Sequence, residues 1–254
     1  MSLESKSNWN IPEKIKDENI MDYLLSKREI EDTGSFLNPQ LKDIPSYESL
    51  FNTEKASKKI LETVKNGGKI VIHGDYDADG ICATSLLWDF LYRDLANHLN
   101  TKIDVIPYIP SRVDQGYGLT ESSLDDVITL GGKLLISVDC GVRDKELIEK
   151  YIDEKKLDFV ITDHHQPPEG FEISRKYPLV HQMYPKHEYV QKEICGATIA
   201  FLLIQAMKAQ VGMGEPLSEN TKGLDLVALS SITDLMPLIG VNRILVKYGI
   251  KQIQ

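Results

Sequence analysis

Residues 69–80 have the sequence Lys-Ile-Val-Ile-His-Gly-Asp-Tyr-Asp-Ala-Asp-Gly. The first part of this stretch is a short apolar run rich in β-branched residues, which predicts a buried strand. Three carboxylates, Asp75, Asp77 and Asp79, follow the strand directly and have glycines on both sides. A buried strand that ends in a polar loop is typical of a parallel sheet, in which ligands bind outside the carboxyl ends of the strands.

The chain around this stretch alternates between strand and helix patterns. Further strands are predicted at residues 103–108, 133–138 and 158–162, and helices at residues 20–31, 56–66, 83–95, 121–129, 145–154, 195–211, 224–235 and 242–254. Such alternation indicates an α/β fold with a parallel β-sheet covered by helices on both faces. We expect this domain, including a helical C-terminal part, at residues 51–254, after a mostly helical N-terminal extension at residues 1–50.

Composition limits the class of protein. The 254 residues, of which 42% are hydrophobic, suffice for one large globular domain. No apolar run approaches the roughly 20 residues that span a membrane, and residues 1–10 lack the apolar core of a signal peptide. We therefore expect a cytoplasmic protein. The three cysteines, Cys82, Cys140 and Cys195, have no CxxC spacing, which argues against disulfides and a zinc cluster.

The net charge is −9, opposite in sign to that of a protein that binds nucleic acid through a broad basic surface. Bound divalent cations would offset part of this charge. Any contact with nucleic acid is then expected to be local, or to be made by a domain outside this chain. The last predicted helix also runs to the final residue without a cap, so we expect a truncated protein.

Two more polar clusters follow predicted strands, at residues 137–141 (Ser-Val-Asp-Cys-Gly) and 162–165 (Thr-Asp-His-His). Each cluster alone has a structural explanation, because Asp and Gly after a strand mark turns and acidic loops are commonly solvated. The carboxyl ends of parallel strands, however, lie along one edge of the sheet. The three clusters together therefore predict a single site.

A site with four or more carboxylates requires positive charge. Two like charges about 4 Å apart repel by roughly 4 kcal/mol at an effective dielectric constant near 20. Divalent cations would offset this repulsion, and the mixture of carboxylates and imidazoles suits Mn²⁺ or Mg²⁺ better than Zn²⁺. The ligands suffice for two ions, an arrangement that activates water against a phosphorus centre.

The strings at residues 73–80, 138–141 and 163–165 resemble, in order, the first three motifs of the DHH phosphoesterases. Other segments resemble the RecJ branch of that family: residues 36–39, 108–112, 116–119, 196–201 and a fourth motif within 225–243. The resemblance implies a 5′-to-3′ exonuclease that degrades single-stranded DNA in DNA repair and recombination. It also implies a second, substrate-gripping domain beyond residue 254.

The same resemblance implies metal ligands and phosphate-binding residues. One ion would be bound by His73, Asp77 and Asp139, and the other by Asp79, Asp139, His164 and Asp234. Asp75 would be an extra ligand or would orient His73. His165 would contact the scissile phosphate, and Arg112 would hold a phosphate oxygen in bidentate fashion. We assign the fourth-motif aspartate to Asp234 rather than Asp225, because Asp234 follows the small residues 230–233.

The chain departs from the RecJ pattern at two places. Ser230-Ser231 stands where Gly-Thr is usual, and Met183-Tyr184-Pro185 stands where Asn-Pro is common. Three other functions stay open: a phosphoesterase for short oligonucleotides, cyclic dinucleotides or nucleoside bisphosphates, an inorganic pyrophosphatase, and a replication-complex scaffold. The Arg112 segment argues against the second, and the retained ligands argue against the third. The sequence indicates no specific protein partner.

Overall fold

The computed structural model describes residues 20–184 and 189–254. They fall into two compact units, with the boundary between Pro39 and Gln40. The first unit contains α1 (Ile20–Ser26) and α2 (Thr33–Leu37). The helix predicted at residues 20–31 is therefore too long.

The early end of α1 has a backbone cause, because Glu29 adopts a left-handed conformation with φ of 56° and a helix cannot continue through such a residue. In the second unit, Leu41 and Leu50 are already buried in the main core. The predicted division of the chain at residues 50 and 51 stays a prediction.

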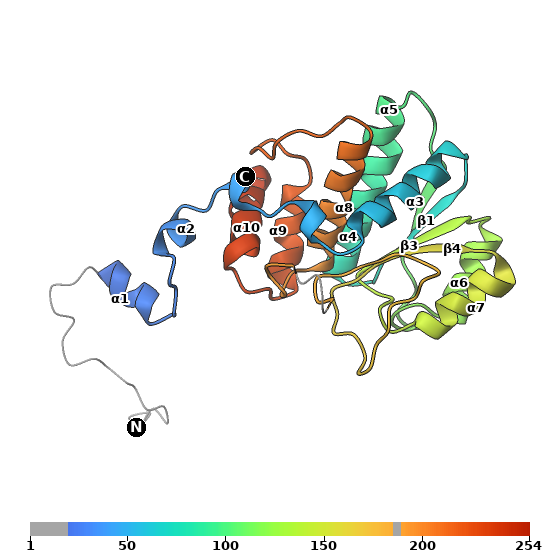
Figure 1. Cartoon of the computed structure of the whole chain (residues 1–254), viewed down its shortest axis with the longest axis horizontal. Helices are drawn as coiled ribbons and strands as arrows, with labels where there is room; N and C mark the ends of the chain where they lie inside the picture. Colours follow the sequence, from blue (N-terminus) through green and yellow to red (C-terminus); the bar gives the residue numbers. More distant parts are fainter. Residues whose placement is uncertain (1–19, 185–188) are drawn as a thin grey trace, which may run out of the picture. The chain divides into compact units, whose positions relative to one another are not determined.

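A sheet of parallel strands forms the centre of the second unit (Figure 1). The strands are β1 (Ile70–His73), β2 (Val105–Tyr108), β3 (Leu134–Val138), β4 (Asp158–Thr162) and β5 (Leu179–Val180). Their order in the sheet is β2-β1-β3-β4-β5, and every neighbouring pair is parallel. The first four strands lie within the predicted ranges. The sequence did not predict β5, because a strand of two residues has no recognisable period.

Helices connect and cover these strands. They are α3 (Thr53–Lys65), α4 (Ala78–Asp89), α5 (Ala96–His98), α6 (Glu121–Thr129), α7 (Lys145–Lys155), α8 (Gly196–Gln210), α9 (Leu224–Thr233) and α10 (Gly240–Ile253), with the 3₁₀ turns η1 (Leu41–Asp43) and η2 (Tyr47–Ser49) and the π-helical segment η3 (Phe90–Leu95). The helix predicted at residues 83–95 begins earlier, at Ala78. The Asp77 side chain caps it by accepting a hydrogen bond from the Gly80 N–H at 2.9 Å.

Alternate residues of the strands form two separate cores. Ile70 and Ile72 lie in a core shared with α3, α4 and α8, whereas Val71 lies in a core shared with α6 and α7. Figure 1 shows α6 and α7 on one side of the strands and α4 and α8 on the other. The predicted parallel sheet with helices on both faces is confirmed.

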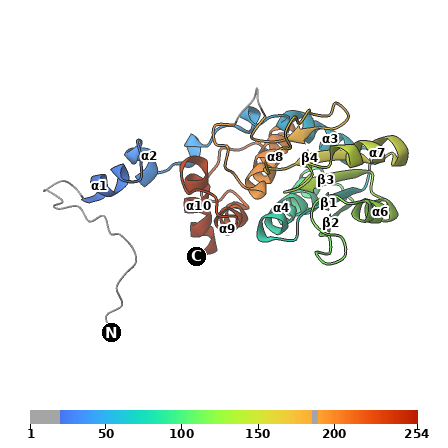
Figure 2. The same cartoon turned by 90° about the horizontal axis from the view of Figure 1, so that it is seen from below.

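The helical C-terminal part is also confirmed. Helix α9 packs against α4 and α10, and Figure 2 shows α9 and α10 side by side. Among the described residues, every helix is too short or too polar to cross a membrane.

Candidate metal centre

The three predicted polar clusters lie at one edge of the sheet. They follow β1, β3 and β4, and β3 pairs with both of the other strands. The parallel arrangement therefore brings the carboxyl ends of all three strands together. Asp75, Asp79, Asp139 and Asp163 are each almost completely buried there.

The His164 imidazole is surrounded by carboxylates. Its Nε2 atom lies 3.0 Å from Asp139 Oδ1, 3.6 Å from Asp79 Oδ2 and 3.6 Å from Asp234 Oδ2. These side chains come from the ends of β4, β3 and α9 and from the first turn of α4. Asp234 therefore lies beside His164, as its predicted role as a ligand of the same ion requires.

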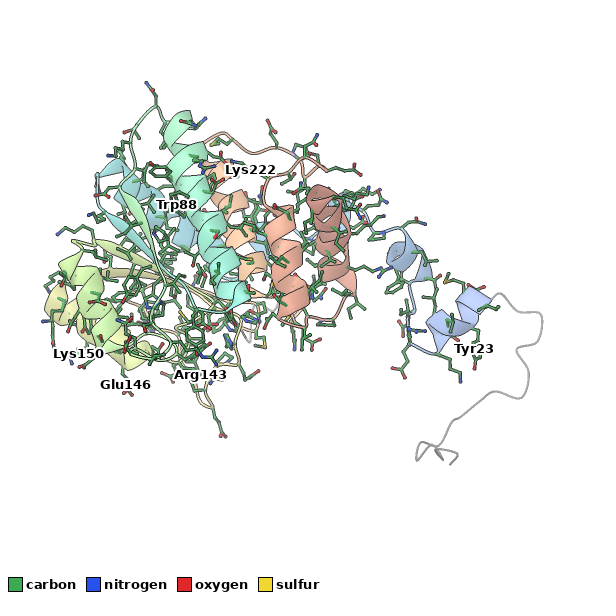
Figure 3. The ribbon with its side chains drawn as sticks, turned by 180° about the vertical axis from the view of Figure 1, so that it is seen from behind. Tyr23, Trp88, Arg143, Glu146, Lys150 and Lys222 are labelled. Carbon is green, nitrogen blue, oxygen red and sulfur yellow. The ribbon has the colours of Figure 1, made fainter. Side chains whose placement is uncertain are left out.

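Asp225, the alternative to Asp234, lies elsewhere. It lines a cavity together with Trp88 and Lys222, which lie close to each other in Figure 3. The position of Asp234 beside His164 agrees with its assignment to the fourth motif.

Three groups of side chains could hold a metal ion, because their ligand atoms lie within 4.8 Å of one another. The groups are Asp75, Asp77 and Asp139; Asp79, His164 and Asp234; and Asp139, His164 and His165. Asp139 and His164 each belong to two of the three groups, and they occur together in one, so the groups are linked. His73 belongs to none of the three, although it ends β1 and is fully buried.

Several ligand atoms of the site have no hydrogen-bond partner among the described residues, although all are buried: His73 Nε2, Asp75 Oδ1, Asp139 Oδ1 and Asp234 Oδ2. Leaving a buried polar atom without a partner costs about 1–3 kcal/mol. Asp139 Oδ1 approaches His164 Nε2 to 3.0 Å without a hydrogen bond. Ligands about 2.1 Å from an octahedral cation lie about 3 Å apart, so this spacing fits a shared metal ion.

The metal-free site is electrostatically unfavourable. Burial, reinforced by the charges of Asp79 and Asp77, raises the pKa of Asp139 from 3.8 to about 10. Burial also raises the pKa of Asp75 and of Asp234, and it lowers the pKa of His73 to about 4. A cation would reverse these effects, because it favours the ionised carboxylate and the neutral imidazole.

Asp79 is held in place by the start of α8. Its Oδ2 accepts a hydrogen bond from the Gly196 N–H at 2.6 Å, and its Oδ1 accepts one from the Ala197 N–H at 2.8 Å. Ser230 Oγ donates a third at 2.5 Å. The serine that departs from the family pattern thus orients a proposed ligand. A helix N-terminus also stabilises a nearby anion.

The loop after β4 presents the His164-His165 pair, and a second loop holds its backbone. Gln182 Nε2 donates to the His164 carbonyl at 2.7 Å, and the His181 ring nitrogen Nε2 lies 2.9 Å from the His165 carbonyl. Both holding residues follow β5 and are almost completely buried. The unpredicted strand therefore positions a predicted part of the site.

Asp163 is a residue that the sequence argument missed. Its Oδ1 lies 2.8 Å from His165 Nδ1, and its Oδ2 accepts from the Val142 N–H at 2.8 Å. The hydrogen bond to Asp163 raises the pKa of His165. Asp163 is the first residue of the Asp-His-His motif at residues 163–165. Its position two residues before His165 is the feature of the sequence from which its role could have been inferred.

Arg112 lies in the loop between β2 and α6, with its guanidinium carbon 5.0 Å from the centre of the Tyr76 ring. Its charge also acts to lower the pKa of Asp75, against the larger effect of burial. Among the described residues no carboxylate forms an ion pair with Arg112, which leaves its fork of N–H groups available to an anion.

Comparison with known proteins identifies the family of this chain. A family model described as DHH family, N-terminal domain matches residues 69–230. Among curated proteins, the chain is similar to the single-stranded-DNA-specific exonuclease RecJ of Bacillus subtilis, with 32% identity over 266 residues. The alignment covers 99% of this chain but only 32% of that relative.

Two solved structures are similar as well. The crystal structure of exonuclease RecJ bound to manganese has a TM-score of 0.67 and 33% sequence identity, covering 80% of this chain and 48% of that chain. RecJ from Thermus thermophilus in complex with Mn²⁺ has a TM-score of 0.68 and 31% identity, covering 92% of this chain and 31% of that chain.

Proposed function

Because the chain belongs to the DHH family, we propose that it forms the catalytic core of a metal-dependent phosphodiester hydrolase. The observation that carries this proposal is the meeting of three His/Asp groups, linked by the shared residues Asp139 and His164, at one edge of the sheet. We propose single-stranded DNA, degraded from its 5′ end, as the substrate. The name of the Bacillus subtilis relative supports that choice.

The proposed ligands of two ions are those expected from the family pattern: His73, Asp77, Asp79, Asp139, His164 and Asp234. Asp75 stands beside Asp77 and Asp139 and would serve as a further ligand or catalytic carboxylate. Mn²⁺ or Mg²⁺ bound there would lower the pKa of a water molecule and neutralise charge on phosphoryl oxygens. The manganese in the two similar structures supports Mn²⁺ as the first choice.

The remaining residues of the site would bind the phosphate. His165 reaches the cluster from the same loop as His164, and its Nδ1 is held by Asp163. Arg112 would hold a phosphate oxygen through two N–H groups, and its stacking on Tyr76 restricts the guanidinium in advance. Together they would fix the phosphate against the metal ligands.

We propose that the protein acts in the cytoplasm, in DNA repair or recombination. The three cysteines are unpaired and buried, as is usual in a reducing compartment. Most of the length of the Bacillus subtilis relative lies outside the matched segment. We propose that a region of that kind grips the substrate, and that residues 1–50 are an extension of the catalytic domain at residues 51–254.

The test is turnover of an end-labelled single strand, with small phosphodiesters, cyclic dinucleotides and pyrophosphate as competing substrates. We expect Mn²⁺ to support hydrolysis of the strand, EDTA to abolish it, and Asp139→Ala to eliminate it. Full activity in excess chelator would rule out the metal mechanism. Faster turnover of pyrophosphate or a cyclic dinucleotide than of the strand would reassign the substrate.

A further inference from the structure

The Tyr117 hydroxyl contacts the ring of His165. Tyr117 Oη lies 3.1 Å from His165 Nε2 and 3.2 Å from Nδ1, and the two rings meet edge to face with centroids 5.7 Å apart. His165 Nδ1 is already engaged, because Asp163 Oδ1 lies 2.8 Å from it. The phenol oxygen is almost equidistant from the two nitrogens, so it lies over the ring between them and not in the ring-plane direction of Nε2.

Asp163 holds the ring at Nδ1, and the Tyr117 hydroxyl contacts the ring between its two nitrogens. The ring-plane direction of Nε2 is then left for the phosphate of the substrate.

Tyr117 is presented by a constrained turn. Gly118 adopts φ of 79°, which side-chain-bearing residues rarely adopt, and a Cβ there would lie 3.2 Å from Asp144 Oδ2. That same carboxylate oxygen accepts a hydrogen bond from the Leu119 N–H at 3.0 Å. The end of the loop between β2 and α6 is therefore hydrogen-bonded to the segment between β3 and α7, which gives the phenol a defined position.

We propose that Tyr117 is a positioning residue, which orients the His165 imidazole toward the phosphate of the substrate. This inference rests on the proposed function, in which His165 contacts the scissile phosphate. The geometry supports it because Asp163 holds the ring at Nδ1 while the Tyr117 hydroxyl contacts the ring between its nitrogens, so that the two residues together fix the direction of Nε2. Removing the hydroxyl leaves the ring held by Asp163 alone.

The test is Tyr117→Phe in the 254-residue chain, with Tyr151→Phe as the matched control. The Tyr151 hydroxyl also has two polar neighbours, Asp125 Oδ1 at 2.8 Å and Glu121 O at 3.1 Å, between which its one O–H hydrogen is shared, but on the face covered by α6 and α7. We expect Tyr117→Phe to lower kcat on the single strand by on the order of 10-fold. Mn²⁺ affinity, measured by calorimetry, and KM should change little, and the control should retain wild-type values.

A double-mutant cycle then shows whether Tyr117 acts through His165. In the His165→Ala background, adding Tyr117→Phe should lower kcat by less than a third as much as it does in the wild type. An equal loss of kcat in both backgrounds would overturn the inference. An effect on KM alone would also overturn it, since Tyr117 would then bind the substrate directly.

Ring-nitrogen NMR spectra of the Mg²⁺ form give a readout that needs no turnover. The His165 signals, identified by their disappearance in His165→Ala, should shift in Tyr117→Phe and not in Tyr151→Phe. Unchanged His165 signals would overturn the inference even if turnover were too slow to measure. Absence of turnover by the wild type would instead refute the proposed function, so the two failures are distinguishable.

Discussion

At the scale of single residues, Asp139 has unfavourable surroundings in the metal-free protein. It is buried, its backbone adopts a left-handed φ of 61°, and burial beside Asp79 and Asp77 raises its pKa to about 10. A residue in this conformation costs on the order of 1–3 kcal/mol, and such residues cluster at functional sites. The position of Asp139, which suits its proposed role as a metal ligand, therefore lowers the free energy of unfolding of the metal-free protein.

Asp139→Asn should accordingly stabilise the metal-free protein while abolishing its response to Mn²⁺. Folding raises the pKa of this carboxyl, so at neutral pH the folded state must bury a charge or take up a proton, and both oppose folding. The amide avoids this cost, and we expect the free energy of unfolding to rise by about 1 kcal/mol or more. Urea unfolding in EDTA and Tm with added Mn²⁺ measure the two effects.

The matched control is Asp43→Asn, at an exposed carboxylate of η1, which should change neither quantity. A less stable Asp139→Asn protein in EDTA would contradict the account of repulsion in the metal-free site.

The sequence predicted the residues of the acidic cluster because each follows a predicted strand or belongs to a family motif. It did not predict Asp163 or Tyr117. Asp163 acts through His165 rather than by joining the carboxylate groups, and Tyr117 comes from a loop that has no periodic pattern. The contact between Tyr117 and His165 depends on how two loops fold over the sheet edge, which neither segment specifies by itself.

At the scale of secondary structure, the start of α8 fits closely against the site. A Cβ added to Gly196 would lie 2.8 Å from Asp139 Cβ and 3.1 Å from Asp79 Oδ2. Real Cβ atoms essentially never approach that closely, so only glycine allows the helix to donate its first N–H groups to Asp79.

Gly196→Ala should therefore destabilise the protein by about 1–3 kcal/mol, as overpacking does in other cores, and should weaken Mn²⁺ binding. Chemical unfolding and calorimetry measure these changes. Gly34→Ala, in α2, is the control, because a Cβ there would meet only Asp32 Oδ1, at an ordinary contact distance of 3.5 Å. Wild-type Mn²⁺ affinity in Gly196→Ala would show that Asp79 needs no support from α8.

The segment after β5 gives a second prediction at this scale. Gln182→Leu removes the hydrogen bond to the His164 carbonyl and should lower Mn²⁺ affinity or activity by about 10–100-fold, as is usual for residues that orient metal ligands. Gln210→Leu is the control, since Gln210 also donates to a backbone carbonyl, that of Glu54, but on α8 away from the site. Equal effects of the two substitutions would mean that Gln182 contributes only to general stability.

Strands and helices were predictable to the extent that they have a period. The four longer strands lie within the predicted ranges, whereas β5 and the first residues of α4 do not. The start of α4 is set by the Asp77 cap, and Asp77 was interpreted only as a ligand. The same carboxylate serves both purposes, and a pattern of apolar residues cannot reveal the second one.

At the scale of the whole molecule, the net charge of −9 limits how the chain can bind a polyanion. The salt dependence of binding reports the number of phosphates neutralised, with a slope of about −0.7 per phosphate for single strands. We expect about one to three contacts for this chain, near Arg112 and the metals, and hence a shallow slope.

Arg112→Ala should reduce the magnitude of that slope by about 0.7 and leave Mn²⁺ affinity unchanged. Arg93→Ala is the control, because Arg93 forms an ion pair with Asp89 at 3.1 Å within α4 and η3. The measurement is the affinity for an end-labelled strand against salt concentration. A steep slope in the wild type, or no change in Arg112→Ala, would show that other cations of the chain bind the strand.

The residues of the three His/Asp groups come from distant parts of the chain, from Asp75 after β1 to Asp234 at the end of α9. A ribosome releases the chain from its N-terminus, so the sheet can form while Asp234 and the start of α8 are still unmade. At that stage His164 lacks one of its carboxylates, and Asp79 lacks the helix that holds it. A nascent or prematurely terminated chain of this kind would therefore lack part of the proposed metal site until synthesis has passed the end of α9.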